Sequence, residues 1–287
     1  MATIYHDYLK KIHSTYMTGD ATEPSYYPLL KELLESLGKK LGMVGGVTVQ
    51  PKRTKAGIPD FLLKTKAGKI VGYVEAKATM IDNLINEAQS EQLLKYRSSL
   101  PNLILTNFLE FYLFRDGKII NEVRLANPVF LKLGKRPVPE NIDRFDELLD
   151  QFFSFSIPQT YTAKALATEL AKRTRFLSSL ILEELSEETE GISGIYKAFK
   201  EELIESLTEE SFADMYAQTI SYGLFSARMQ AKEKEFSLST VYEYIPRTIP
   251  LLRQLFWFLT GPNRPESLEW IVDDIAGVLA SADLSSI

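Results

Sequence analysis

The hydrophobic pattern changes its period along the chain, and this change limits the possible folds more than any other sequence feature. Between residues 47 and 120, short apolar runs are separated by turn signals, which is typical of strands. After the proline-containing segment 133–139, strand patterns stop and apolar residues recur at helical spacing. We therefore expect an α/β N-terminal domain over residues 1–135, with a mixed central sheet flanked by helices, followed by an all-α helical domain over residues 136–287.

The expected elements of the first half are helices and short strands in mixed order. Helices are predicted over residues 2–16, 24–37 and 81–98, with Gly38 ending the second. Strands are predicted over residues 47–51, 60–64, 70–77 and 102–106, and in a hairpin over 110–120 whose Asp116-Gly117 pair favours a tight turn. In the second half, helices are predicted over residues 140–153, 162–186, 193–207, 210–235, 246–259 and 265–281.

Composition excludes several kinds of site. The chain of 287 residues has no cysteine and only two histidines, so disulfides, thiolate zinc sites and cysteine nucleophiles are excluded, and a metal would need oxygen ligands. Because no apolar run is long enough for a membrane span and the N-terminus lacks the order of a signal peptide, we expect a cytoplasmic protein without a membrane partner.

Charge is divided unevenly between the two halves. Residues 1–135 carry 19 Lys and Arg against 13 Asp and Glu, whereas residues 136–287 carry 14 against 25. Affinity for phosphates depends on local positive potential, so a polyanion would bind the first half. Ordinary variation of a solvated surface explains the same division equally well.

Two acids and a lysine are spaced as a hairpin would place them. Asp60 begins one predicted strand, and Glu75-Ala76-Lys77 ends the next, with a glycine-containing turn between them. If the strands pair, Asp60 and Glu75 come to the same end of the sheet, and alternation puts Glu75 and Lys77 on one face. Clustered carboxylates favour a hard cation, so Mg²⁺ is the expected cofactor, with Mn²⁺ able to replace it. A cation beside an ammonium group is suited to phosphodiester hydrolysis.

The same residues resemble a known family. Ile58-Pro59-Asp60 followed by Val74-Glu75-Ala76-Lys77 is similar to the signature of the PD-(D/E)xK nuclease superfamily, and the segment from Gln92 to Tyr96 resembles the Gln-x-x-x-Tyr element of its RecB-like branch. The resemblance implies that Asp60 and Glu75 bind the metal, that Lys77 positions the attacking water, and that Gln92 supports the metal site or a phosphate.

More narrowly, Thr22-Glu23-Pro-Ser-Tyr26 and the segment from Leu105 to Gly117 resemble the nuclease region of single-chain restriction-modification enzymes (type IIG and single-polypeptide type I). That resemblance implies double-stranded DNA as substrate. It also implies a helical connector, and adenine methyltransferase and target-recognition domains downstream in a larger protein. Double-strand cleavage needs two active sites, and a second copy of the chain is one source of the other. Glu23 matches the early acid of the family, and Glu32 is the competing candidate.

Further residues are candidates for contact with DNA. Lys52, Arg53 and Lys55 precede Asp60 on an expected loop, where they could contact phosphates or form an ordinary solvated turn. Tyr96 is a candidate for stacking or hydrogen bonding near DNA. Asn127-Pro-Val-Phe130 resembles a methyltransferase motif imperfectly, and no glycine-rich cofactor turn accompanies it, so a linker is expected there.

These observations leave three hypotheses. The first is a metal-dependent endodeoxyribonuclease module of a restriction-modification enzyme. The second is a catalytically inactive nuclease fold that serves as a DNA-binding or assembly module. The third is a helical interaction protein with an incidental sheet, and it predicts that Asp60, Glu75 and Lys77 lie far apart.

Overall fold

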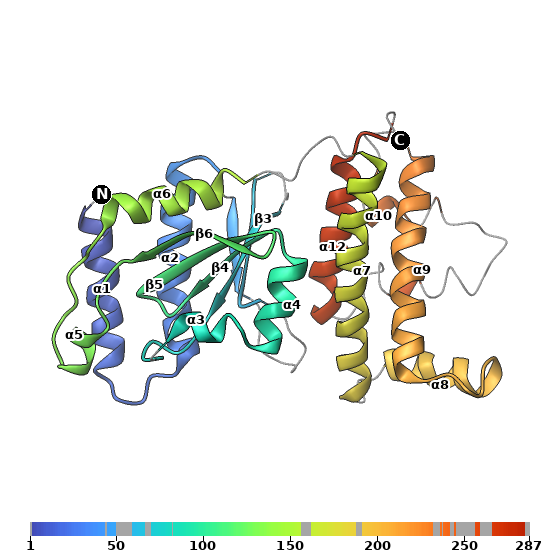
Figure 1. Cartoon of the computed structure of the whole chain (residues 1–287), viewed down its shortest axis with the longest axis horizontal. Helices are drawn as coiled ribbons and strands as arrows, with labels where there is room; N and C mark the ends of the chain where they lie inside the picture. The colour runs from blue at the N-terminus through green and yellow to red at the C-terminus, as the bar shows by residue number, and fades with distance from the viewer. Residues whose placement is uncertain are drawn as a thin grey trace. The chain divides into compact units, whose positions relative to one another are not determined.

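The chain forms two compact units (Figure 1), one ending near residue 155 and the other beginning after it. The computed structural model describes residues 2–43, 45–49, 59–66, 70–81, 83–155, 162–187, 191–231, 236, 238–241, 244, 256–258 and 266–284. The first unit has a mixed sheet flanked by helices, and the described part of the second is helical. The predicted fold class, an α/β domain followed by an α domain, is confirmed.

Six strands form one sheet, with their order in space following their order in sequence. The strands are β1 (Gly46–Val49), β2 (Phe61–Lys64), β3 (Ile70–Ala76), β4 (Asn102–Thr106), β5 (Glu110–Arg115) and β6 (Lys118–Arg124). The β3–β4 pair is parallel, and the other described pairs are antiparallel. Parallel neighbours need a crossover connection. Two short helices, α3 (Leu84–Glu87) and α4 (Glu91–Ser99), lie in this crossover.

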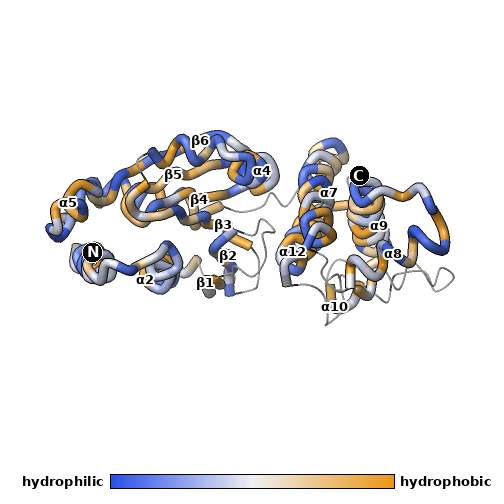
Figure 2. The backbone as a smooth tube through the Cα atoms, turned by 90° about the horizontal axis from the view of Figure 1, so that it is seen from below, coloured by the Kyte–Doolittle hydropathy of each residue, from blue (hydrophilic) through white to orange (hydrophobic). Residues whose placement is uncertain are grey.

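Helices cover both faces of the sheet. On one face, α1 (Ala2–Tyr16), the short 3-10 helix η1 (Glu23–Tyr26), α2 (Tyr27–Lys40) and α6 (Ile142–Phe153) share a hydrophobic core with the strands. On the other face lie α3 and α4, in front of the strands in Figure 1, and Figure 2 shows α4 away from α2. The Arg97 guanidinium of α4 stacks 4.7 Å from the centre of the Phe114 ring.

The α6 helix belongs to the first unit, so the division between the units lies beyond the expected position at residue 135. Its apolar side chains are buried in the core under the sheet, and the Tyr5 hydroxyl of α1 donates to Asp146. The Asn102 amide donates to the carbonyl of Phe152 at 2.9 Å and to that of Val71 at 2.8 Å. These bonds join α6 to β3 and β4. A short helix, α5 (Val129–Lys132), precedes it, at the end of the segment expected to be a linker.

Gly72 of β3 lies where α6 approaches the sheet most closely. A Cβ atom at this position would come within 2.5 Å of the Phe152 ring and 2.7 Å of the Asn102 amide nitrogen. Glycine is therefore required by space at this position rather than by a turn.

Two local helix predictions need correction. The helix expected over residues 81–98 is divided into α3 and α4, because the Asn83 and Ser90 side chains each accept a backbone N–H and so begin a new helix. The helix expected to end at Gly38 continues to Lys40. The hairpin turn is confirmed at Asp116 and Gly117, whose φ angles of 48° and 80° suit a tight turn of the primed type.

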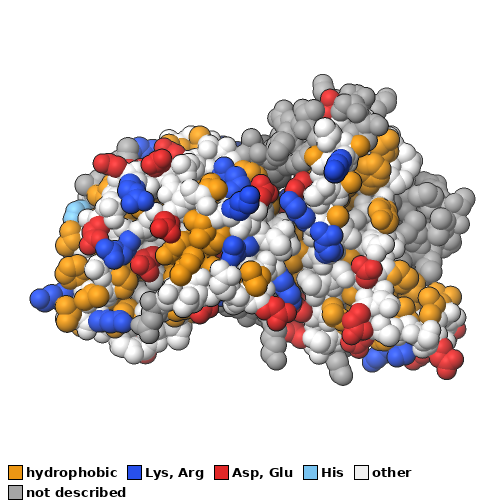
Figure 3. All heavy atoms as spheres, in the orientation of Figure 1, with side chains coloured by type: hydrophobic (Ala, Val, Ile, Leu, Met, Phe, Trp, Pro, Cys, Tyr) orange, Lys and Arg blue, Asp and Glu red, His pale blue; other side chains and the backbone are white. Residues whose placement is uncertain are grey.

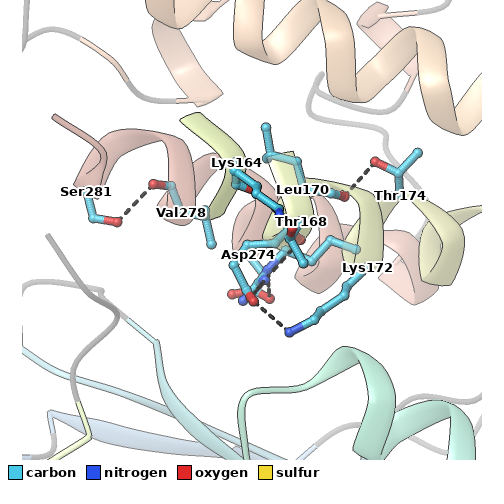
Figure 4. Close-up of polar contacts among 10 residues, drawn as sticks. Lys164, Thr168, Leu170, Lys172, Thr174, Asp274, Val278 and Ser281 are labelled. Carbon is cyan, nitrogen blue, oxygen red and sulfur yellow. Dashed lines mark hydrogen bonds and ion pairs between the residues drawn. The ribbon is translucent and has the colours of Figure 1, made fainter. Parts of the chain in front are cut away.

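The second unit contains helices α7 (Ala163–Ser186), α8 (Ile192–Glu202), α9 (Glu209–Gln230), α10 (Leu238–Val241) and α12 (Glu266–Ser281). The helix expected over residues 246–259 lies mostly outside the described residues. A buried ion pair joins α7 to α12: Arg173 Nε donates to Asp274 Oδ2 at 2.8 Å, and both side chains are 1% exposed. Figure 4 shows Asp274 of this pair, together with Lys172, which forms an ion pair with Glu169 at 2.7 Å. Arg173 also donates to Glu169 at 2.7 Å, so its guanidinium has two carboxylate partners.

Candidate active site

The β2–β3 register places the two predicted acids level with each other. Phe61 pairs with Val74 in this antiparallel ladder. One residue further toward the ends of the two strands, Asp60 therefore comes opposite Glu75. Both acids are 1% exposed. Glu75 lies at the C-terminal end of β3 beside Leu105 of the parallel strand β4. The hypothesis of an incidental sheet with scattered acids is therefore wrong.

Hydrogen bonds fix the orientation of the Asp60 carboxylate. The Ala76 amide donates to Oδ2 at 2.7 Å, and the Tyr27 hydroxyl donates to Oδ1 at 2.5 Å. Asp60 lies just before β2. Its side chain accepts the Ala76 amide hydrogen, which a backbone carbonyl would accept if β2 were longer.

Tyr27 connects the early acid to this pair. Its hydroxyl lies 2.8 Å from Oε1 of Glu23 as well as 2.5 Å from Oδ1 of Asp60. Burial raises the pKa of Tyr27 well above its ordinary value, and the neighbouring Asp60 and Glu23 carboxylates raise it further. The phenol therefore stays neutral and acts as a donor. Sequence alone favours a core position for Tyr27, since an aromatic residue on an amphipathic helix is mainly a core residue.

Lys77 lies at the edge of the same group. Its Nζ atom is 2.8 Å from Oε1 of Glu75, and its side chain is 16% exposed against 2% for that of Glu75. The Lys77 amide donates to the carbonyl of Thr106 at 2.8 Å, which extends the β3–β4 pairing past the end of β3. The ammonium group is thus held beside a buried carboxylate and remains accessible to solvent.

Glu23, rather than Glu32, shares a partner with Asp60. Glu32 is exposed on α2 and forms an ion pair with Lys11 at 2.5 Å. Glu23 lies at the start of η1, where its carboxylate bonds to Tyr27. Of the two candidates for the early acid, the geometry favours Glu23 as the third carboxylate near the site.

Gln92 and Tyr96 form a separate pair on α4. The Gln92 amide donates to the Tyr96 hydroxyl at 2.9 Å, and Gln92 is exposed while Tyr96 is 0% exposed. This burial disagrees with the predicted contact of Tyr96 with DNA, because a ring enclosed in the core offers no surface to a duplex. Tyr96 instead anchors the Gln92 side chain. Lys52, Arg53 and Lys55, the other predicted DNA contacts, lie outside the described residues.

Charge in the first unit is less one-sided than the sequence division indicated. With α6 included, residues 1–155 carry 21 Lys and Arg against 18 Asp and Glu, because α6 and its approach add five acids. Figure 3 shows basic and acidic side chains intermixed over the visible face of this unit. Positive potential is therefore not uniform over the unit.

The donor set suits a hard divalent cation. Two buried acids lie level with each other at the ends of β2 and β3, and Mg²⁺ in phosphoryl-transfer sites is often held by one or two carboxylates together with waters and substrate phosphates. Among the described residues, no cluster of three or more His, Cys, Asp or Glu side chains could by itself hold a metal ion. Asp60 and Glu75 would therefore be the two side-chain ligands of such a cation.

Comparisons with known proteins add little to this geometry. No protein-family model matches the chain, and no curated protein matches it significantly. Among solved structures, a cryo-electron microscopy structure of a DrdV–DNA complex has a TM-score of 0.40 and 20% sequence identity. The similarity covers 100% of this chain and 27% of that chain. Within the described residues, no helix is both long enough and apolar enough to cross a membrane.

Proposed function

We propose that the first unit is a metal-dependent endodeoxyribonuclease that hydrolyses phosphodiester bonds of double-stranded DNA. The observation that carries this proposal is the register that brings Asp60 level with Glu75, with Lys77 bonded to Glu75 at 2.8 Å. Two buried acids and a partly accessible ammonium at one sheet edge match the needs of phosphodiester cleavage. The resemblance to PD-(D/E)xK nucleases supports the same function.

Each residue has a distinct role in this proposal. Asp60 and Glu75 would hold Mg²⁺ or Mn²⁺, and the ion when bound would lower the pKa of water and offset charge on the phosphate. Lys77 is a compact positive charge with three donors, so it can orient the attacking water or donate to the phosphate. Because Tyr27 and the Ala76 amide hold Asp60, that acid needs little rearrangement.

We further propose that the unit works within a restriction-modification protein. The helical second unit of the chain would be a connector. Recognition of the DNA sequence would come from target-recognition and adenine methyltransferase domains. Lys52, Arg53 and Lys55 would contact phosphates, and Gln92 would support the site from α4. A second copy would supply the other active site for double-strand cleavage. The connector, the downstream domains and the role of Gln92 rest on the resemblance stated above, and the phosphate contacts rest on the expected loop before Asp60.

Plasmid cleavage tests the proposed activity. The purified chain is incubated with supercoiled DNA and Mg²⁺ or Mn²⁺, and nicked and linear products are separated by electrophoresis. Asp60→Asn and Lys77→Met should remove cleavage while DNA binding, measured by fluorescence anisotropy, is retained. If the wild-type chain and these variants all cut DNA in the presence of metal, another site or a contaminating nuclease would be responsible.

The second candidate is an inactive nuclease fold that binds DNA or assists assembly. One observation favours it: both oxygens of Asp60 already accept hydrogen bonds from the protein. DNA binding without cleavage by the wild-type chain under Mg²⁺, Mn²⁺ and Co²⁺ would support this candidate over the first.

A further inference from the structure

The Tyr27 hydroxyl lies between two carboxylates from different parts of the chain. Asp60 precedes β2 and Glu23 begins η1, and their oxygens are 2.5 and 2.8 Å from the phenol oxygen. A hydroxyl carries one hydrogen, so the two carboxylates share a single donor. The position of Glu23 relative to Asp60 is therefore set through this phenol.

Packing holds the Tyr27 ring in place. The ring is centred 5.0 Å from the Phe61 ring and 6.4 Å from the Phe108 ring, and the residue is 5% exposed. Phe61 follows Asp60 directly, so the phenol and the acid are fixed by the same end of β2. A ring confined in this way presents its hydroxyl in one direction, which makes it a suitable support for a carboxylate.

We infer that Tyr27 is a positioning residue of the proposed cation site, where it orients the Asp60 carboxylate and holds Glu23 beside it. This inference rests on the proposed function. Groups that bond to carboxylate ligands of a metal fix ligand orientation, and their loss typically lowers metal affinity or activity about 10- to 100-fold. The phenol itself contacts neither substrate nor cation. It acts through Asp60 and Glu23.

The test compares Tyr27→Phe with a matched variant, Tyr8→Phe. Tyr8 is 4% exposed, and its hydroxyl donates to the Phe108 carbonyl at 2.9 Å, so this variant also removes one buried hydroxyl bond without touching a carboxylate. Mn²⁺ affinity is measured by calorimetry, plasmid cleavage is followed against Mn²⁺ concentration, and unfolding is followed by circular dichroism. We expect Tyr27→Phe to weaken Mn²⁺ binding about 10-fold or more, and Tyr8→Phe to leave it within about twofold, at similar melting temperatures.

Combination with Glu23→Gln distinguishes positioning from general damage. If Tyr27 acts through Glu23 and Asp60, the Glu23→Gln/Tyr27→Phe double variant should lose less Mn²⁺ affinity than the product of the two single losses. If the wild-type chain binds Mn²⁺ and cleaves DNA and Tyr27→Phe changes neither, the inference is overturned and the proposed function stands. Failure of the wild-type chain to bind Mn²⁺ would overturn both.

Discussion

The amide of Ala76 donates to Oδ2 of Asp60 at 2.7 Å, so the proposed metal ligand also completes the hydrogen bonding at the end of β3. Asp60 therefore has a structural role that can be separated from its charge. Asparagine keeps an oxygen for the Ala76 amide and an NH₂ group facing Tyr27, whereas alanine removes the acceptor of the Ala76 amide and leaves the Tyr27 hydroxyl its bond to Glu23.

We predict that Asp60→Asn and Asp60→Ala both lose cleavage but differ in stability. Asp60→Ala should unfold more easily than Asp60→Asn by about 1–3 kcal/mol, because a buried amide loses its acceptor. Urea denaturation followed by circular dichroism measures the difference. Equal stability of the two variants would show that the Ala76–Asp60 bond contributes little to folding.

Lys77 is predicted to influence stability as well as cleavage. Lys77→Met should lose cleavage and also destabilise the first unit, because the Glu75 side chain is only 2% exposed and would lose its ammonium partner. Glu75→Gln/Lys77→Met should regain stability relative to Lys77→Met, since the buried charge is gone, and should still fail to cleave. Urea denaturation and plasmid cleavage of the two variants measure both effects, and recovery of cleavage in the double variant would contradict the proposed roles.

Gly72 provides a test of packing under α6. Gly72→Ala should destabilise the first unit by about 1–3 kcal/mol or more, because the added Cβ would lie 2.5 Å from the Phe152 ring. Gly46→Ala in β1 is the matched control, since an added Cβ there meets nothing within 4 Å. Thermal unfolding of the two variants would be compared, and equal melting temperatures would contradict the close approach of α6.

The second unit has its own spectroscopic probe. Both tryptophans of the chain, Trp257 and Trp270, belong to it, and Trp270 packs at 5.4 Å from the Phe176 ring. We predict that Asp274→Ala lowers the unfolding free energy of this unit by about 3–5 kcal/mol, because the buried Arg173 guanidinium loses a partner. Tryptophan fluorescence in urea would follow this unfolding. A loss below about 1 kcal/mol would indicate that Glu169 alone satisfies Arg173.

The same unit should show a defined response to acid. Burial opposes ionisation of Glu169, but hydrogen bonds from Lys172 and Arg173 outweigh it and hold the pKa below its ordinary value of 4.5. A lowered pKa stabilises the folded state above the unfolded value, and this contribution is lost as pH falls through the folded pKa. The stability difference between wild type and Glu169→Gln should therefore be constant near neutral pH and shrink below about pH 4.5. A difference that grows on acidification would contradict the assignment.

The strands could be predicted from sequence because their signals are local. The β4 strand is an apolar run between Pro101 and Asn107, and the Asp116-Gly117 turn has a strong local signal. Alternation around Ala76 also sufficed to propose that Glu75 and Lys77 share a face, and these two are bonded. Local periodicity was therefore enough to predict a side chain's face where its partner lies on the same strand.

The remaining features depend on contacts between distant parts of the chain. The α6 helix is amphipathic like the helices of the second unit, and period alone does not indicate which core receives its apolar face. Tyr27 and Asp60 are 33 positions apart, so their bond has no signal in either segment. The burial of Tyr96 likewise follows from how α4 packs on the sheet.

The dual role of Asp60 affects how related sequences should be read. A lineage that abandoned DNA cutting would still be selected to keep an oxygen acceptor where β2 begins, since the Ala76 amide needs one. The side chain of Lys77, which is partly accessible, instead bonds to the Glu75 carboxylate. Under the proposed function, an aspartate at position 60 reports only that the strand ends in the same way, whereas loss of the Glu75–Lys77 pair marks loss of the cation site.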